Sequence, residues 1–177
     1  MNLWHDIRPE RVKDDDFIAV IEIKKGSKNK YELDKETGAL RLDRVLYTST
    51  HYPANYGFIP LTYAEDNDPL DVLVLCSQDI DTMALVRCYP IGVVRMSDNS
   101  ETDDKIIAIP FGDPSYNHIK DICGVSPHIL EEIMHFFKVY KQLEKKSTEN
   151  IQILGLSRAR EIFNAARAAY NGLIVCD

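Results

Sequence analysis

A cluster of acidic residues directly before an apolar run limits most strongly how this chain can fold. Residues 65–71 contain four acids, and residues 72–75 are continuously apolar, which is typical of a buried strand. Pro69 fixes the backbone angle φ within the acidic segment, so the loop is stiff. Two carboxylates about 4 Å apart repel by roughly 1 kcal/mol in water and about 4 kcal/mol at an effective dielectric constant of 20. The folded loop must therefore be solvated, share protons or bind cations.

Cation binding is one of two interpretations of this loop, and the other is a fully solvated acidic turn. A stiff loop that leads into an apolar strand favours cations, and oxygen ligands suit hard ions such as Mg²⁺ or Mn²⁺. A calcium loop of the helix–loop–helix type that starts at Asp66 would need Gly at its sixth position and Glu at its twelfth. Asp71 and Ser77 occupy those positions, which excludes the calcium loop.

Length and charge narrow the class of protein further. A chain of 177 residues predicts a single domain, residues 1–177, with a substantial core. The net charge of −7 argues against nucleic acid or an anionic membrane as a partner. No apolar run reaches membrane-spanning length, and the first residues lack an apolar signal core. The four cysteines form no CxxC pair and are typical of reduced cysteines, so we expect a cytoplasmic protein.

Short strands dominate the first two thirds of the chain, and two helices follow. Residues 1–16 are polar and irregular, and residues 51–60 form an ordered loop by their Pro and Gly content. For the first helix, Ser126 is a suitable N-cap and Pro127 a suitable first residue. This order predicts an α+β fold, with a β-barrel or strongly curved sheet and helices packed outside. The pattern predicts strands at 17–23, 30–33, 40–44, 72–75, 84–96 (one or two strands) and 106–109, and helices at 127–146 and 157–172.

Several charged side chains interrupt the predicted strands. Glu22 stands in an apolar strand, and because acids are seldom buried unpaired, it should face a polar cavity or a cation. Lys30 and Glu32 share one face of their strand, as do Asp103 and Lys105 at the entry to another. Each could be an ordinary solvent-facing residue. Their recurrence near the acidic loop favours a common site instead.

Hydroxyl and guanidinium groups complete this set. Tyr52 and Tyr56 are either a core pair or donors that pack their rings and hydrogen-bond through their hydroxyls. Arg44 ends one strand of a predicted hairpin. Because acids hold divalent cations while Lys, Arg and Tyr hold a polyanion, the predicted ligand is a small phosphate compound bound through metals.

The segment 66–72 resembles the signature of the soluble family I inorganic pyrophosphatases. The resemblance covers roughly residues 17–146, and several spaced motifs in one order are more specific than a single match. It implies a five-stranded β-barrel of oligonucleotide-binding type flanked by two main helices. It also implies Mg²⁺-dependent hydrolysis of pyrophosphate to two phosphates. The other segments that carry the resemblance are 30–32, 43–44, 52–57, 98–105 and 135–145.

The resemblance also implies a role for each site residue. Asp68 is the expected general base. The expected metal ligands are Asp66, Asp71 and Asp103 for the pair of ions that activates water, and Asp98 with Asp103 for an ion that arrives with substrate. The expected phosphate contacts are Lys30, Arg44, Lys105, Tyr140 and Lys141, and the expected supporting residues are Glu22, Glu32, Tyr52 and Tyr56.

Cofactor and assembly are further expectations from the resemblance. Several Mg²⁺ ions per site are implied, with Mn²⁺ or Zn²⁺ as substitutes, and the assembly is a homo-oligomer, a hexamer in bacterial members. The chain departs from the family at Asn99, where an acid is common, so an outer metal is in question. Two other functions remain open at this stage. One is a metal-dependent phosphatase for nucleotides or other organic phosphates, and the other is a barrel that has lost catalysis and binds a ligand or nucleic acid.

Overall fold

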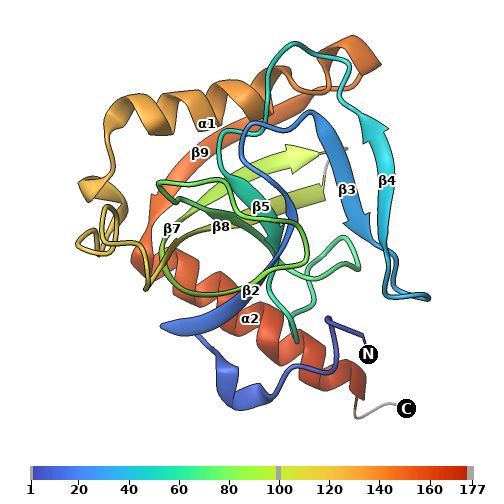
Figure 1. Cartoon of the computed structure of the whole chain (residues 1–177), viewed down its shortest axis with the longest axis vertical. Helices are drawn as coiled ribbons and strands as arrows, with labels where there is room; N and C mark the ends of the chain where they lie inside the picture. The colour runs from blue at the N-terminus through green and yellow to red at the C-terminus, as the bar shows by residue number, and fades with distance from the viewer. Residues whose placement is uncertain (1, 99–100, 175–177) are drawn as a thin grey trace.

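The computed structural model describes residues 2–98 and 101–174, which form a sheet-rich core with two main helices (Figure 1). This confirms the predicted α+β class. Three short 3₁₀ helices are η1 (Pro9–Arg11), η2 (Ile122–Gly124) and η3 (Gln142–Glu144), and the α-helices are α1 (Pro127–Val139) and α2 (Leu156–Ile174). The strands are β1 (Val12–Lys13), β2 (Asp16–Ile23), β3 (Asn29–Leu33), β4 (Leu40–Val45), β5 (Asn55–Phe58), β6 (Asp71–Val74), β7 (Leu85–Asp98), β8 (Glu101–Pro110) and β9 (Thr148–Gly155).

Seven strands form one sheet in the order β1-β2-β5-β6-β8-β7-β9. Since β2 also pairs with β7, the strands β2, β5, β6, β8 and β7 pair in a closed ring. The pair β6–β8 is parallel, and the other strand pairs of the described chain are antiparallel. Strands β3 and β4 form a separate hairpin that lies beside the sheet in Figure 1.

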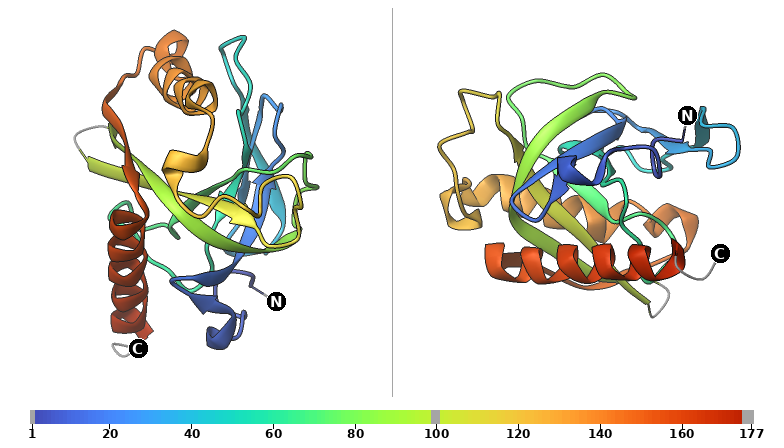
Figure 2. Two further views of the ribbon diagram at one scale, coloured as in Figure 1. Left: turned by 90° about the vertical axis from the view of Figure 1, so that its left-hand side faces the viewer. Right: turned by 90° about the horizontal axis from the view of Figure 1, so that it is seen from below.

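Two apolar clusters fix this arrangement. Along β6, Val72 packs in a cluster that contains Phe163 of α2, while Leu73 packs in a cluster that contains Phe136 of α1. Because successive strand residues point to opposite faces, one short strand supplies both clusters. The two helices accordingly lie at opposite ends of the sheet (Figure 2).

The predicted first helix extends too far. It begins where expected, although the Ser126 hydroxyl makes no cap hydrogen bond, but α1 ends at Val139 instead of Lys146. A 3₁₀ turn follows, and Lys145 adopts a left-handed φ of 59°, which reverses the chain. The charged residues at 144–146 thus belong to this reversal, and the next segment is β9, a strand that the sequence analysis did not predict.

The region 84–96, predicted as one or two strands, is the single strand β7, which runs to Asp98. Two other segments differ from expectation. The loop expected at 51–60 contains β5. Residues before β2 are not irregular, because they include η1 and β1 and bury Trp4 against Tyr63 and Tyr170. The second helix and the β3–β4 hairpin agree with prediction.

None of the helices in the described ranges is both long and apolar enough to span a bilayer.

Gly57 permits the close approach of β5 to β2. A Cβ atom at this position would overlap the carbonyl oxygen of Val20 and would lie 3.0 Å from the Cα of Ile21. Backbone atoms cannot move aside as a flexible side chain can, so we predict that Gly57→Ala lowers the free energy of unfolding by about 3 kcal/mol or more. Urea unfolding measures this change. The matched control is Gly112→Ala, whose Cβ would meet nothing within 4 Å, and an equal loss in both variants would contradict the prediction.

Candidate active site

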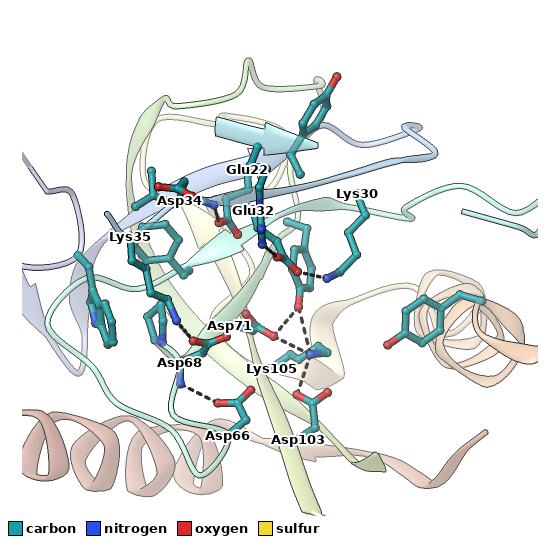
Figure 3. A pocket seen from close by; sticks show the side chains of 18 of the residues that line it. Glu22, Lys30, Glu32, Asp34, Lys35, Asp66, Asp68, Asp71, Asp103 and Lys105 are labelled. Carbon is teal, nitrogen blue, oxygen red and sulfur yellow. Dashed lines mark hydrogen bonds and ion pairs between the residues drawn. The ribbon is translucent and has the colours of Figure 1, made fainter. Parts of the chain in front are cut away.

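A cavity of about 520 Å³ lies between the β3–β4 hairpin, the acidic loop, the N-terminal ends of β6 and β8, and the end of α1 (Figure 3). It collects most of the residues that the sequence analysis singled out. Those that line it are Glu22, Lys30, Glu32, Tyr56, Asp66, Asp68, Asp71, Asp103, Lys105, Tyr140 and Lys141. Arg44 and Tyr52 are outside this lining. Asp98 ends β7 and its side chain is outside the described part of the chain, as is the whole of Asn99.

Strand register places three of these residues. Asp71 opens β6, and Lys105 is its partner in the parallel strand β8. Asp103 lies two positions before Lys105 and therefore on the same face of β8. The predicted juxtaposition of Asp103 and Lys105 is confirmed by a distance of 2.7 Å between Asp103 Oδ1 and Lys105 Nζ.

Local hydrogen bonds hold the acidic loop. The backbone N–H of Asp68 donates to Asp66 Oδ1 at 3.1 Å, and the N–H of Ala64 donates to the carbonyl of Asp68 at 2.8 Å. Asn67 adopts a left-handed φ of 65°, and its side-chain oxygen accepts a hydrogen bond from the Tyr63 hydroxyl at 2.6 Å. An Asn tolerates this conformation better than most residues do. The loop is thus held by its own hydrogen bonds, in addition to the stiffness expected from Pro69.

The ammonium group of Lys105 is the centre of the cavity floor. Its Nζ lies 2.7 Å from Asp71 Oδ2 and 3.1 Å from the hydroxyl of Tyr56, in addition to its contact with Asp103. The Tyr56 hydroxyl donates in turn to Asp71 (Figure 3). Only 3% of the Lys105 side chain is exposed. Burial disfavours its charge, but the carboxylates of Asp103 and Asp71 hold the pKa of Lys105 well above its usual range.

Burial disfavours the charged forms of three acids in this cavity. Burial, then the charge of Asp103, raises the pKa of Asp66. Burial also raises the pKa of Asp71, although the Lys105 ammonium opposes the rise. Burial raises the pKa of Glu22 to about 8. The Leu33 N–H, which donates to Glu22 Oε1 at 2.7 Å, opposes this rise. One lysine therefore does not balance the acids, and further positive charge in the cavity would stabilise their ionised forms.

The donor set suits a hard divalent ion. Asp66, Asp68, Asp71 and Asp103 line one cavity and offer only carboxylate oxygens, the ligands that Mg²⁺ prefers. Within residues 2–98 and 101–174, no three acids, histidines or cysteines converge closely enough to hold an ion as they stand. The Lys105 ammonium lies between two of the acids instead. The residues fit a metal by chemistry and location, with a rearrangement of Lys105.

Cationic residues of the hairpin are each paired with acids. Lys30 Nζ contacts Glu32 and lies 3.5 Å from Asp43 Oδ2. Arg44 donates from Nη1 to the same Asp43 oxygen at 2.5 Å, and its Nε lies 2.8 Å from Oε1 of Glu144. Lys30 lines the cavity and Arg44 lies outside its lining on the same hairpin, and ion pairs hold both side chains in place before any ligand binds.

The two tyrosines combine both interpretations considered from the sequence. Tyr52 packs its ring on Tyr56 and Phe136, with ring centroids 5.2 and 4.8 Å apart, and both tyrosines are buried. Burial raises the pKa of each hydroxyl well above its usual value. Tyr56 is at the same time a hydrogen-bond partner of the cavity floor.

Trp4 and Lys35 are among the residues of the cavity wall that sequence reasoning missed. Lys35 forms an ion pair with Asp68 and lies with its Nζ 5.1 Å from the centre of the Trp4 ring. The Trp4 indole is fixed by a hydrogen bond to the carbonyl of Thr62 at 2.8 Å. Lys35 belongs to the hairpin turn, and nothing in its local pattern separates it from a solvated turn residue.

Fold and cavity together define a class of protein: an α+β protein whose acidic cavity, walled by lysines and an arginine, suits a small anion held through divalent cations.

Comparisons with known proteins agree with this class. The family model described as inorganic pyrophosphatase matches residues 19–171. A soluble inorganic pyrophosphatase of Zea mays is 47% identical over 167 residues, which cover 94% of this chain and 78% of that protein. The solved inorganic pyrophosphatase of Thermus thermophilus has a TM-score of 0.91 at 37% identity and covers 97% of this chain and 99% of that one. That of Helicobacter pylori has a TM-score of 0.87 at 43% identity, with coverage of 90% and 96%.

The chain belongs to the inorganic pyrophosphatase family, in its soluble family I branch, and is an enzyme of the inorganic diphosphatase class.

The raised pKa of Glu22 predicts a specific pH dependence of stability. Its pKa in the fold is about 8 against an ordinary 4.5, so the protonated form is favoured by folding. The contribution is fully present below pH 4.5 and is lost as pH rises through 8. In metal-free protein, we predict that Glu22→Gln reduces the decline in the free energy of unfolding across this range by up to a few kcal/mol. Urea unfolding at several pH values measures it, and parallel curves for wild type and variant would contradict it.

Proposed function

We propose that this enzyme hydrolyses pyrophosphate to two phosphates in a Mg²⁺-dependent reaction, with Asp68 as the general base. The observation that carries the proposal is the single cavity in which Asp66, Asp68, Asp71 and Asp103 face the hairpin cations. Membership of the inorganic pyrophosphatase family supports the choice of substrate. A free pyrophosphate would be repelled by these acids, so the reaction needs cations as well as protein side chains.

The proposed metal ligands are Asp66, Asp71 and Asp103, with Asp98 as a further ligand by resemblance to the family. When bound, Mg²⁺ would offset the charge of pyrophosphate and lower the pKa of a water from about 15.7 toward 7. Mn²⁺ or Zn²⁺ could substitute. The raised pKa values of Asp66 and Asp71 support this proposal, since added positive charge would favour both carboxylates.

Asp68 is suited to accept the proton of the attacking water. Its backbone is fixed by the bond from its N–H to Asp66, and its side chain is directed into the cavity beside Lys35 (Figure 3). About half of the Asp68 side chain is exposed. A carboxylate in this position can reach a water in the cavity without giving up a bond in the core, and a positioned base of this kind contributes about 10²–10⁴-fold to turnover.

The cationic wall binds the phosphates. Lys30 and Arg44 from the hairpin, with Tyr140 and Lys141 after α1, would donate to phosphate oxygens and stabilise charge on the leaving phosphate. Lys105 would join them once cations take over its contacts with Asp71 and Asp103. The proposed supporting residues, which orient these groups and waters, are Glu22, Glu32, Tyr52 and Tyr56.

We further infer the type of barrel, the oligomeric state and the cellular location of the enzyme. The closed ring of pairings among β2, β5, β6, β8 and β7 supports a five-stranded barrel of oligonucleotide-binding type. Residues 1–177 would act as one domain in a cytoplasmic homo-oligomer, a hexamer by resemblance, without nucleic acid or membrane as a partner. Sedimentation that finds only monomer at micromolar concentration would contradict the oligomer.

A phosphate-release assay tests the reaction. We expect the purified protein to release two phosphates per pyrophosphate with Mg²⁺ present and none after chelation. Nucleotides and sugar phosphates should be hydrolysed far more slowly, since the cavity has cationic walls but no identified base or sugar pocket. Equal turnover of nucleotides would favour the organic-phosphate phosphatase, and no release from any substrate would favour a binding protein.

A pair of substitutions separates the base from the ligands. Asp68→Asn keeps the shape and removes the basicity, so we predict a loss in turnover of about 10²–10⁴ with Mg²⁺ affinity within a few-fold. Asp71→Asn should weaken Mg²⁺ binding, and added Mg²⁺ should partly restore its rate. Steady-state kinetics over a Mg²⁺ series measures both. A rate in Asp68→Asn that recovers with added Mg²⁺ would show that Asp68 is a ligand.

A further inference from the structure

We propose that Glu144 is a positioning residue that fixes the Arg44 guanidinium and joins the β3–β4 hairpin to the segment after α1. The inference rests on the proposed function for its kinetic consequences. Glu144 lies in η3, directly after the segment that carries Tyr140 and Lys141.

The contact is a partly buried ion pair. Arg44 Nε lies 2.8 Å from Glu144 Oε1, and 9% of the Glu144 side chain and 23% of the Arg44 side chain are exposed. The other Glu144 oxygen, Oε2, is buried without a hydrogen-bond partner in the described chain, and Arg44 Nε makes no well-directed hydrogen bond there either. Glu144 thus gives up water and receives one ion-pair contact in return.

Such a pair contributes little to the stability of the fold. Removing charges from water costs several kcal/mol per ion, and only excellent geometry with further hydrogen bonds offsets this cost. The Glu144 carboxylate lacks those further bonds. The arrangement is better explained by the orientation that it imposes on Arg44 than by a gain in stability.

The pair connects two structural units that each carry phosphate-binding candidates. Strands β3 and β4 hydrogen-bond to each other as a separate sheet, and they carry Lys30 and Arg44. Tyr140 and Lys141 follow α1, which packs on β9 and the larger sheet instead. Because the Arg44–Glu144 contact joins the two units, it should help to set the distance between the two pairs of proposed phosphate contacts.

Arg44 is held from two sides. Asp43 accepts from its Nη1 at 2.5 Å, but Asp43 lies on the same strand and moves with the hairpin. Glu144 is the partner from outside the hairpin. Loss of the Glu144 charge should leave Arg44 paired with Asp43 on the hairpin, without its contact to the segment after α1.

The test is a double-mutant cycle on pyrophosphate hydrolysis with Glu144→Gln, Arg44→Gln and the double variant, each shown to be folded by circular dichroism. We expect Glu144→Gln to lower kcat/KM by about 10- to 100-fold, mainly through KM, since a misplacement of about 1 Å costs up to roughly 100-fold. In the Arg44→Gln background, the same substitution should cost less than about twofold. The control, Glu161→Gln, removes the partner that lies 2.7 Å from Arg158 on α2 and should leave kcat/KM within about twofold.

If the loss of kcat/KM in the double variant equals the product of the losses in the two single variants, the inference is overturned. An unchanged KM in Glu144→Gln would also overturn it. Hydrogen exchange gives a readout that does not depend on substrate: Glu144→Gln should speed amide exchange in β3 and β4 more than in α1, and unchanged exchange in the hairpin would also overturn it. If the wild type fails to hydrolyse pyrophosphate, the proposed function fails first, and the exchange result alone then decides whether Glu144 anchors the hairpin.

Discussion

The mutual repulsion of carboxylates around one buried lysine is the constraint on which this structure depends. Lys105 contacts Asp71 and Asp103, the Tyr56 hydroxyl joins the same group, and 3% of the lysine side chain is exposed. The pairing satisfies the ammonium, but the pKa values of two other acids of the cavity, Glu22 and Asp66, remain raised. The fold therefore keeps a cluster of acids whose charged forms are disfavoured, and a bound cation would stabilise those charged forms.

Much of the fold could be predicted because its strands alternate or are continuously apolar. The segments that escaped prediction lack that pattern. Gly57 makes β5 a poor strand by composition, yet the missing side chain is what allows its backbone to approach Val20. At the end of α1 the helical pattern continues past Val139, but the chain changes to the 3₁₀ turn η3, which ends at the left-handed Lys145 and leads into β9, the partner of β7. Both features depend on contacts with distant strands.

The candidate site could be predicted where residues share a strand or a tight loop, as Asp103 and Lys105 or Asp66 and Asp68 do. Partners that meet across the fold could not. Lys35 reaches Asp68 across the cavity because Trp4, far away in sequence, supports its side chain. Burial was equally hidden: the sequence gives no sign that Lys105, whose ammonium forms part of the cavity floor, is only 3% exposed. The local sequence pattern predicts which face of a strand a residue occupies, whereas the burial of its side chain depends on the packing of the whole sheet.

The parallel pairing of β6 with β8 has a consequence for the fidelity of folding. Asp71 lies opposite Lys105 in the native register. A slip by one residue would turn every side chain of one strand to the opposite face. A slip by two, which preserves the apolar faces, would bring Asp71 opposite Asp103 and set carboxylate against carboxylate. A slip in that direction keeps the apolar faces buried, so the alternation of charge at the entry to β8 adds a penalty that hydrophobic burial alone would not supply.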